Sequence, residues 1–505
     1  MKGTVSSACW VKAIGPAYDY PDADSYQAAL KEQVGGASAS DFIIDIDANM
    51  IPVKQGASTQ DCDPDRYGTA DAHGADADWC NYDLSKWCNA VTISQRAYYN
   101  YKNDPIGSPI MEDDIQGYFV YIPRYAYQVM RYSALNNTPV DFQAFNIAFQ
   151  NKTDPKYIPH DEGQHSSSYD YRTGWDDEWD RAPNLCNQSS NSLPDPQYKD
   201  ESCWATHPAF TFGKTELNGI WVGKFETSGG TAVLPNQYSY INEDVGVLFS
   251  ASINMSQNPD GAAGGNDRIA KNAGRNDHDL SNKTQSRMAK NSDWGAVAYL
   301  ATSDYGRWGA AGGNEVWINS SLERDATGCA GDSVSAEMSY SCNKYDTNTG
   351  VHASTTDNIY GIYDMAGGTT ELTLSNRGAI ANTNFMATMP QTRYMNIYYV
   401  GPFKIRPSRS ASSNESFYNF DVCDFKLCGG QANYETTTVQ SVSSYSESWA
   451  ADSSRFVDSN MWQLRGGHYA AEDSAGLFAS IEGSDGEGFT GLTLPFAFRA
   501  VLSEF

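Results

Sequence analysis

Ten cysteines offer the most reactive chemistry in this sequence, because a thiol can act as a nucleophile, bind a metal ion or form a disulfide. No two of them have the C-x-x-C spacing of a zinc site, and the seven histidines do not cluster with them. An even number of cysteines at short separations in a polar chain predicts disulfides, and therefore an oxidising, extracytoplasmic compartment. The expected local pairs are Cys186–Cys203, Cys329–Cys342 and Cys423–Cys428, the last left open between a disulfide and free thiols in a loop.

An acidic loop carries the pattern closest to a metal site. Asp61, Asp63 and Asp65 have the D-x-D-x-D spacing that opens a calcium-binding loop. Arg66 stands where the turn glycine belongs, and Ala72 stands where a bidentate glutamate is required. We therefore predict a solvated acidic loop and assign no metal or other cofactor. Calcium binding is left as an open alternative that no complete motif supports.

Sequence signatures of catalysis are missing. The chain contains no H-E-x-x-H, no G-x-S-x-G and neither phosphate-binding glycine fingerprint. His160 and His165, in HDEGQH, lie in a Pro-flanked polar stretch that is typical of a solvated surface. The sequence therefore predicts a protein that is not an enzyme.

The charge balance is strongly acidic, with 62 Asp and Glu against 35 Lys and Arg and a net charge of −27. Such a surface repels phosphate backbones and anionic lipids, so nucleic-acid binding and membrane-surface binding are set aside. The chain has no run of eighteen apolar residues, and MKGTVSSACW lacks the apolar region of a signal peptide. Membrane attachment is thus expected only through an N-terminal anchor that is missing from this sequence.

Composition and pattern predict a loop-rich chain with many short strands and few helices. Strands are expected within 41–53, 87–93 and 219–229, which are dense in β-formers. The run 117–132 also reads as β-structure, and an edge or bulge is expected at Pro123 because proline cannot donate to a sheet ladder.

The clearest helix is expected over 291–303. Asn291 can cap it, Asp293 lies favourably in its first turn, and Trp294 and Val297 belong to one apolar face. Residues 1–110 are polar and broken by Gly, Asp and Asn, so we predict an N-terminal accessory region there. A larger domain is expected over 111–505, with an insertion at 133–210 that is rich in Pro, Asn and Ser.

Three ordered motifs resemble one known fold. They are Arg287 with SDWGAVAYL, IYGIYDMAGGTTELT at 359–373, and the C-terminal LRGG…FAFRAVL. They resemble the corresponding helix, GLYDM-x-GNVWEW turn and RGGS…GFR ending of the formylglycine-generating-enzyme/sulfatase-modifying-factor type of C-type lectin fold. The chain is also similar over nearly its whole length to bacterial extracellular proteins, some pilin-like, that carry this fold. The resemblance implies an α+β, C-type-lectin-like fold with few helices, short strands and long loops.

The resemblance also implies a set of structural residues. These are Trp294, Tyr363, Met365, Arg465, Gly466, Gly467 and Arg499. Arg465 and Arg499 are expected to fix loops through bidentate hydrogen bonds. The enzyme of the family acts through two cysteines after the Arg-Gly-Gly motif, and no cysteine follows Arg465 here. Glu371 could bridge loops or bind a cation, but Gly368 and Thr370 replace the family's Asn and Trp, which leaves a calcium site incomplete.

The irregular segment between the Arg-Gly-Gly turn and the last strand, near 465–502, is the candidate binding surface. Loops on a rigid scaffold often carry recognition, and aromatic anchors among small polar residues are typical of paratopes. The predicted ligand contacts are His468, Tyr469, Glu472, Asp473, Ser474, Ser480, Glu482, Ser484, Asp485, Glu487, Phe489 and Thr490.

The same segment is the hypervariable part of retroelement-diversified ligand-binding proteins, which resemble this arrangement. Their variation arises at adenines of Asn codons, which accounts for residues such as His468 and Tyr469 but not for Glu472, Glu482 or Glu487. Diversification of this chain therefore stays open.

Together, these features lead to the hypothesis of a secreted or cell-surface bacterial ligand-binding protein, an adhesin or receptor-binding protein. Its partner would be a protein or glycan on another cell or particle. The alternatives are a phage tail-tip receptor-binding protein and a structural subunit of an extracellular filament. Homo-oligomerisation stays open.

Overall fold

The computed structural model describes residues 9–15, 19–46, 50–56, 78–93, 101, 103–128, 145–153, 204–212, 215–229, 232–237, 239, 248, 251–252, 284–310, 315–319, 329–330, 343–376, 396–397, 430–433, 446–447, 452–454, 462–469, 475–483 and 496–504. Among these residues strands far outnumber helices. The α-helices within these ranges are α1 (Ala23–Glu32), α6 (Asn291–Ala301) and α7 (Arg307–Ala310). The expected sheet-rich α+β fold with few helices is therefore confirmed. No helix in this part of the chain is long and apolar enough to cross a membrane.

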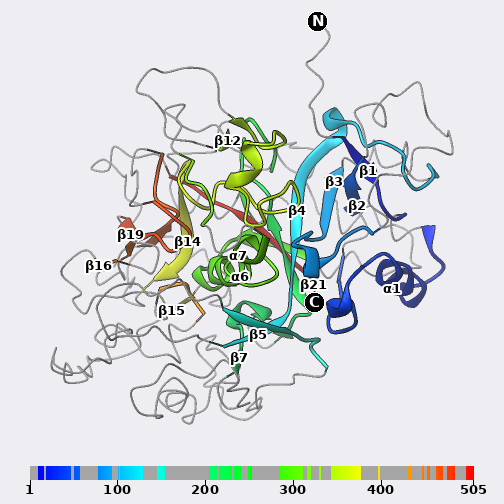
Figure 1. The fold of residues 1–505 in the computed structure, drawn as a ribbon, viewed down its shortest axis with the longest axis horizontal. Coiled ribbons are helices and arrows are strands. Elements are labelled where there is room, and N and C mark those ends of the chain that lie inside the picture. The colour runs from blue at the N-terminus through cyan, green and yellow to red at the C-terminus, as the bar shows by residue number, and fades with distance from the viewer. Residues whose placement is uncertain are drawn as a thin grey trace, which may run out of the picture.

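One seven-stranded antiparallel sheet joins strands from both ends of the chain (Figure 1). In spatial order these are β1 (Trp10–Lys12), β2 (Met50–Gln55), β3 (Asn89–Ile93), β4 (Ile115–Pro123), β10 (Gly219–Gly223), β21 (Ala500–Glu504) and β11 (Thr284–Met288). Trp221 of β10 lies opposite Tyr121 of β4 on one side and Leu502 of β21 on the other. The C-terminal strand is thus an interior member of the sheet.

This sheet continues across the boundary that the sequence suggested at residue 110. Strand β3 pairs with β4 from Asn89 opposite Val120 to Ile93 opposite Ile115. Residues 1–110 therefore add three strands to the sheet that contains β4 and β21. The division into an accessory region and a larger domain stays a prediction.

The expected strand within 41–53 is only half present. Residues 50–53 belong to β2, whereas 41–46 form no strand. The backbone carbonyls of Ile43 and Ile44 accept hydrogen bonds from the Tyr121 hydroxyl (2.8 Å) and the Gln27 amide (2.8 Å). These side chains satisfy the segment's polar backbone where a neighbouring strand was expected.

An edge or bulge was expected at Pro123; instead strand β4, which lies between β3 and β10, ends at this residue and the chain changes sheets. Strand β4 ends at Pro123, and β5 (Tyr125–Gln128) belongs to a three-stranded sheet with β6 (Asn146–Phe149) and β7 (Trp204–Thr206). The buried Arg124 lies between them; its backbone N–H donates to Asn218 O (2.7 Å) and its Nη1 binds Glu216 (2.5 Å). A short hairpin, β8 (Thr211–Phe212) and β9 (Thr215–Glu216), follows.

The second seven-stranded sheet is built from the C-terminal part of the chain. Its strands are β14 (Thr370–Asn376), β15 (Asn396–Ile397), β16 (Ser446–Glu447), β17 (Ser453–Ser454), β18 (Trp462–Arg465), β19 (Ser480–Gly483) and β20 (Phe496–Ala497). Strand β18 lies between β14 and β19, and β20 runs parallel to β14. A separate ladder pairs β12 (Cys329–Ala330) with β13 (Asn343–Lys344).

Helix α6 contacts β4 of the first sheet and β14 of the second (Figure 1). The helix expected at 291–303 is therefore confirmed, but it is buried on every side, where one apolar face was expected. Lys290, not Asn291, is the residue before its first turn, and Asp293 Oδ2 accepts the Lys290 N–H (2.7 Å). Arg287 compensates Asp293 through a buried ion pair, with Nη2 2.9 Å from Oδ1.

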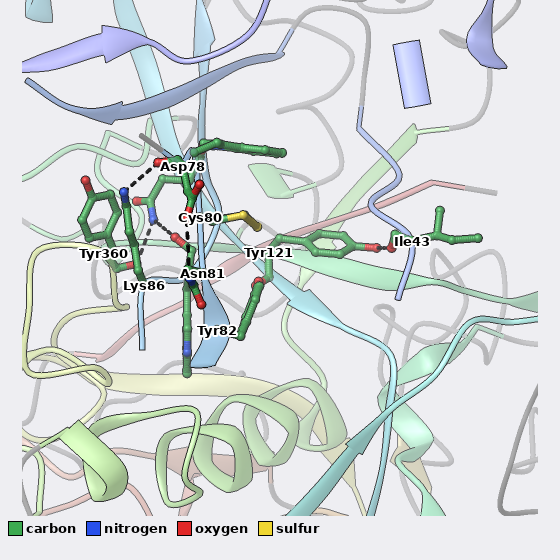
Figure 2. The surroundings of a disulfide bond; sticks show 12 residues. Ile43, Asp78, Cys80, Asn81, Tyr82, Lys86, Tyr121 and Tyr360 are labelled. Atoms are coloured by element: carbon green, nitrogen blue, oxygen red, sulfur yellow. Dashed lines mark hydrogen bonds between the residues drawn. A yellow bond between two sulfur atoms is a disulfide. The ribbon is translucent and has the colours of Figure 1, made fainter. Parts of the chain in front are cut away.

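A disulfide joins Cys80 and Cys88 (Figure 2). It closes a hairpin whose Trp87 Nε1–H donates to Tyr305 O (2.7 Å) and whose Ser85 hydroxyl donates to Gly306 O (3.0 Å). Cys9 is also disulfide-bonded. The expected partners Cys186, Cys203, Cys342, Cys423 and Cys428 lie outside the described residues, and of Cys329 only the backbone in β12 is described.

Candidate functional site

The Arg-Gly-Gly motif forms the turn that the sequence suggested. Gly466 and Gly467 have φ of 81° and 73°, a left-handed conformation that favours glycine. A Cβ on Gly467 would lie 2.7 Å from Ala475 Cα, so the returning chain packs directly against the turn. We call residues 466–479, between β18 and β19, the 466–479 loop; 466–469 and 475–479 of it are described.

Arg465 lies beneath this loop as a fully buried cation. Its Nη1 donates to Ala479 O (3.2 Å), and its Nη2 donates to Gln431 O (2.5 Å) and Ala432 O (3.1 Å). Its guanidinium carbon is 5.8 Å from the centre of the Trp294 ring. Arg465 therefore ties the loop to the 431–432 segment from the protein interior.

Two further buried side chains hold the returning half of the loop. Trp294 of α6 donates its Nε1–H to Leu477 O (2.7 Å), and Asp452 Oδ2 accepts the Phe478 N–H (2.9 Å). Gly476 packs so closely against the Asp452 carboxylate that any Cβ there would clash with it. The base of the loop is thus fixed by an indole, a carboxylate and a guanidinium from three different segments.

Trp294→Phe should loosen the loop while leaving the fold intact. The substitution keeps most of the buried ring but leaves Leu477 O without its donor, at an expected cost of about 1–3 kcal/mol. Amide hydrogen exchange at 476–479 should accelerate. Trp87→Phe is the matched control, because it removes a similar bond to Tyr305 O yet should leave exchange at 476–479 unchanged. Equal exchange in the two variants would show that Trp294 does not hold the loop.

The predicted ligand contacts have different positions in the structure. His468 is half-buried, and burial lowers its pKa. Tyr469 is only 9% exposed and stacks edge-on against His468, with ring centres 5.7 Å apart. Ser480 is 1% exposed and accepts the Asn433 amide (2.8 Å), which argues against the expected ligand contact because its hydroxyl lies in the interior.

The other predicted contacts lie partly or wholly outside the described residues. For Glu482 only the backbone, in β19 opposite Gln463, is described. The remaining residues lie outside the described part of the chain: Glu472, Asp473, Ser474, Ser484, Asp485, Glu487, Phe489 and Thr490.

Arg499, expected to fix loops through bidentate hydrogen bonds, is buried and binds both oxygens of Glu371. Its Nε donates to Glu371 Oε2 (3.0 Å), its Nη2 binds Oε1, and Nη1 and Nη2 also donate to Gly223 O (2.9 Å) and Tyr363 O (3.0 Å). Burial raises the pKa of Glu371 to about 7, against the opposing effect of Arg499. Tyr363 and Met365, the two other residues expected to be structural here, are fully buried.

Two further acids, which the sequence did not single out, surround this ion pair. Glu226 Oε1 accepts the Thr369 N–H (2.9 Å), and Asp364 Oδ1 accepts the Asn319 amide (2.9 Å). Burial, reinforced by Glu371 and Asp364, raises the pKa of Glu226 well above its ordinary value. No group of three or more His, Cys, Asp or Glu side chains with metal-site geometry occurs among the described residues.

A small cavity opens next to the 466–479 loop, and sequence patterns did not predict it. Its charged lining comes from Arg307 of α7, Glu315 and Asp452, and Leu477 and Phe478 of the loop form part of its wall. Glu315 and Asp452 are far apart in the sequence and belong to no motif, so only folding brings them to one cavity.

Comparison with known proteins adds no family assignment. The chain matches no protein-family model and none of the curated proteins with which it was compared.

Proposed function

We propose that this chain is a secreted or cell-surface bacterial ligand-binding protein, an adhesin or receptor-binding protein. In this proposal the scaffold is a C-type-lectin-like fold of the formylglycine-generating-enzyme type, and the C-terminal loop surface near 465–502 recognises a protein or glycan. Recognition would proceed by shape and hydrogen bonding, without catalysis and without a cofactor. The proposed location outside the cell is supported by the Cys80–Cys88 disulfide, which an oxidising compartment favours.

The observation that carries this proposal is the anchoring of the 466–479 loop. Arg465, Trp294 and Asp452 hold its base by hydrogen bonds from the interior, while His468 remains half-buried at its start. The described ends of the loop, 466–469 and 475–479, would lose little conformational entropy on binding when they are fixed in this way, which favours affinity. Irregular surface loops on rigid elements are also the usual location of recognition sites.

The experiment compares two sets of alanine substitutions in the purified chain. The loop variant replaces His468, Glu472, Asp473, Asp485 and Glu487, and the control variant replaces the exposed Asp24 and Glu32 of α1. Each protein is tested on a glycan array and against a phage-displayed peptide library, with thermal unfolding as the check on folding.

We expect the wild type to retain specific probes and the loop variant to bind them at least about tenfold more weakly, with unchanged unfolding. The control variant should bind like the wild type. Undiminished binding by the loop variant would place recognition elsewhere, and a wild type that binds no probe would contradict the proposed function.

A further inference from the structure

The cavity beside the 466–479 loop combines an apolar wall with two carboxylates. It is lined by Ala301, Thr302, Arg307, Trp308, Glu315, Val316, Asp452, Gly476, Leu477 and Phe478. Its volume of about 20 Å³ leaves room for one or two water-sized groups, and not for a sugar ring. Any occupant would therefore insert only a small terminal group.

Asp452 is a deeply buried charged group of this cavity, only 2% exposed. Its Oδ2 accepts the Phe478 N–H (2.9 Å), while Oδ1 has no hydrogen-bond partner among the described residues. A carboxylate oxygen at the wall of a cavity is a hydrogen-bond acceptor, so this position favours an incoming N–H group. Burial, followed by the nearby charge of Glu315, raises the pKa of Asp452 well above its ordinary value, and Phe478 N–H and Arg465 oppose that rise.

Glu315 is the second carboxylate of the cavity and remains exposed to solvent. The surrounding protein raises its pKa to about 7, with Arg307 opposing. Arg307 itself is already engaged: its Nη1 binds Asp357, which also contacts His352 Nδ1 (2.6 Å), and its Nε binds Glu315 O. With its cation compensated in this way, the cavity has a negative balance when Asp452 and Glu315 are ionised.

We propose that this cavity binds a primary alkylammonium group, with the nitrogen between Asp452 and Glu315 and the apolar stem along Trp308 and Leu477. An ammonium supplies three N–H donors on a compact cation, which can bond to the two carboxylates. Its alkyl chain can pack against the apolar wall of the cavity. The ammonium is that of a lysine side chain on a protein ligand. This assignment of the source rests on the proposed function, because the loop that would contact the ligand also lines the cavity.

The test is calorimetric titration of the purified chain with n-butylammonium chloride, alongside sodium chloride and n-butanol. We expect saturable binding of the ammonium only, weakened about threefold or more by Glu315→Gln and about tenfold or more by Asp452→Asn. Glu32→Gln and Asp24→Asn make the same chemical changes on α1 and should leave binding unchanged. If the Asp452 variant fails to fold, Glu315→Gln still tests the proposal, because Glu315 is exposed and its substitution should not disturb folding.

Binding should also depend on pH in a defined direction. Ionised carboxylates attract the ammonium; the protein raises the pKa of Glu315 to about 7 and that of Asp452 well above its ordinary value, so affinity should rise about tenfold from pH 5.5 to pH 8 as Glu315 loses its proton. The amine stays protonated throughout this range.

The proposal would be overturned if the wild type showed no saturable ammonium binding or bound n-butanol equally well. It would also be overturned if both acid variants bound the ammonium with the affinity of the wild type. These results are separate from the array experiment, which tests the loop as a whole. Ammonium binding without probe capture would leave the cavity assignment standing and remove the proposed function; probe capture without ammonium binding would do the reverse.

Discussion

Replacing Arg499 by methionine should destabilise the folded chain by about 3–5 kcal/mol. The guanidinium is 1% exposed and binds both oxygens of Glu371, so its removal leaves a carboxylate uncompensated in the interior. Gly223 O and Tyr363 O also lose their donors. Urea-induced unfolding at pH 7, followed by tryptophan fluorescence, measures the loss.

The double variant Arg499→Met/Glu371→Leu separates charge burial from packing. A buried ion pair can be replaced by apolar groups at little cost, so the double variant should recover part of the stability that the single variant loses. Lys31→Met, on the exposed face of α1, is the control for removing a cation and should change stability by less than about 0.5 kcal/mol. A single Arg499 variant that loses less than about 1 kcal/mol would show that the pair is not a structural anchor.

Glu226→Gln should make the chain more stable than the wild type above neutral pH and leave it nearly unchanged in acid. Burial raises the pKa of Glu226, so the folded chain keeps a proton that the unfolded chain releases near its ordinary pKa of 4.5. The stability that this proton provides is complete below that value and is lost as pH rises towards the folded-state pKa. One such proton corresponds to about 1.4 kcal/mol per pH unit.

Glutamine imitates the protonated acid at this position, because its amide can bond to Ser239 while its carbonyl still accepts the Thr369 N–H. We expect Glu226→Gln to exceed the wild type by about 2 kcal/mol or more at pH 8 and to match it near pH 5. The pKa of Glu371 is also raised, to about 7, so this residue lowers the free energy of unfolding with rising pH in both proteins. Unfolding curves across this range, with Glu32→Gln as control, provide the measurement; parallel pH profiles for the wild type and Glu226→Gln would contradict the prediction.

Local sequence patterns determined the main elements of the candidate site. The apolar and small residues of 291–303 predicted α6, and the β-formers of 219–229 predicted β10. The two glycines after Arg465 predicted a tight turn, and both have positive φ. These features depend on neighbouring residues, whose steric and hydrogen-bonding preferences act over a few positions.

The surroundings of each element could not be predicted from local sequence patterns. Periodicity predicted one apolar face for α6, but the helix lies between two sheets and even Asn291 and Asp293 are buried. Asp293 is tolerated there because Arg287 pairs with it. The ion pair between Arg287 and Asp293 became evident only in the folded structure, although the two residues are close in the sequence.

The charged groups of the interior and of the cavity were decided by tertiary structure alone. Glu226 and the 359–373 motif, which carries Asp364 and Glu371, meet near Arg499 from distant parts of the sequence, and Glu315 meets Asp452 only when α7 packs near the 466–479 loop. The sequence by itself established an acidic, cysteine-containing, strand-rich chain with an irregular C-terminal segment. Which of its 62 acids would be buried, and against which cation, depended on folding, because desolvation and Coulomb interaction follow distance through space rather than separation along the chain.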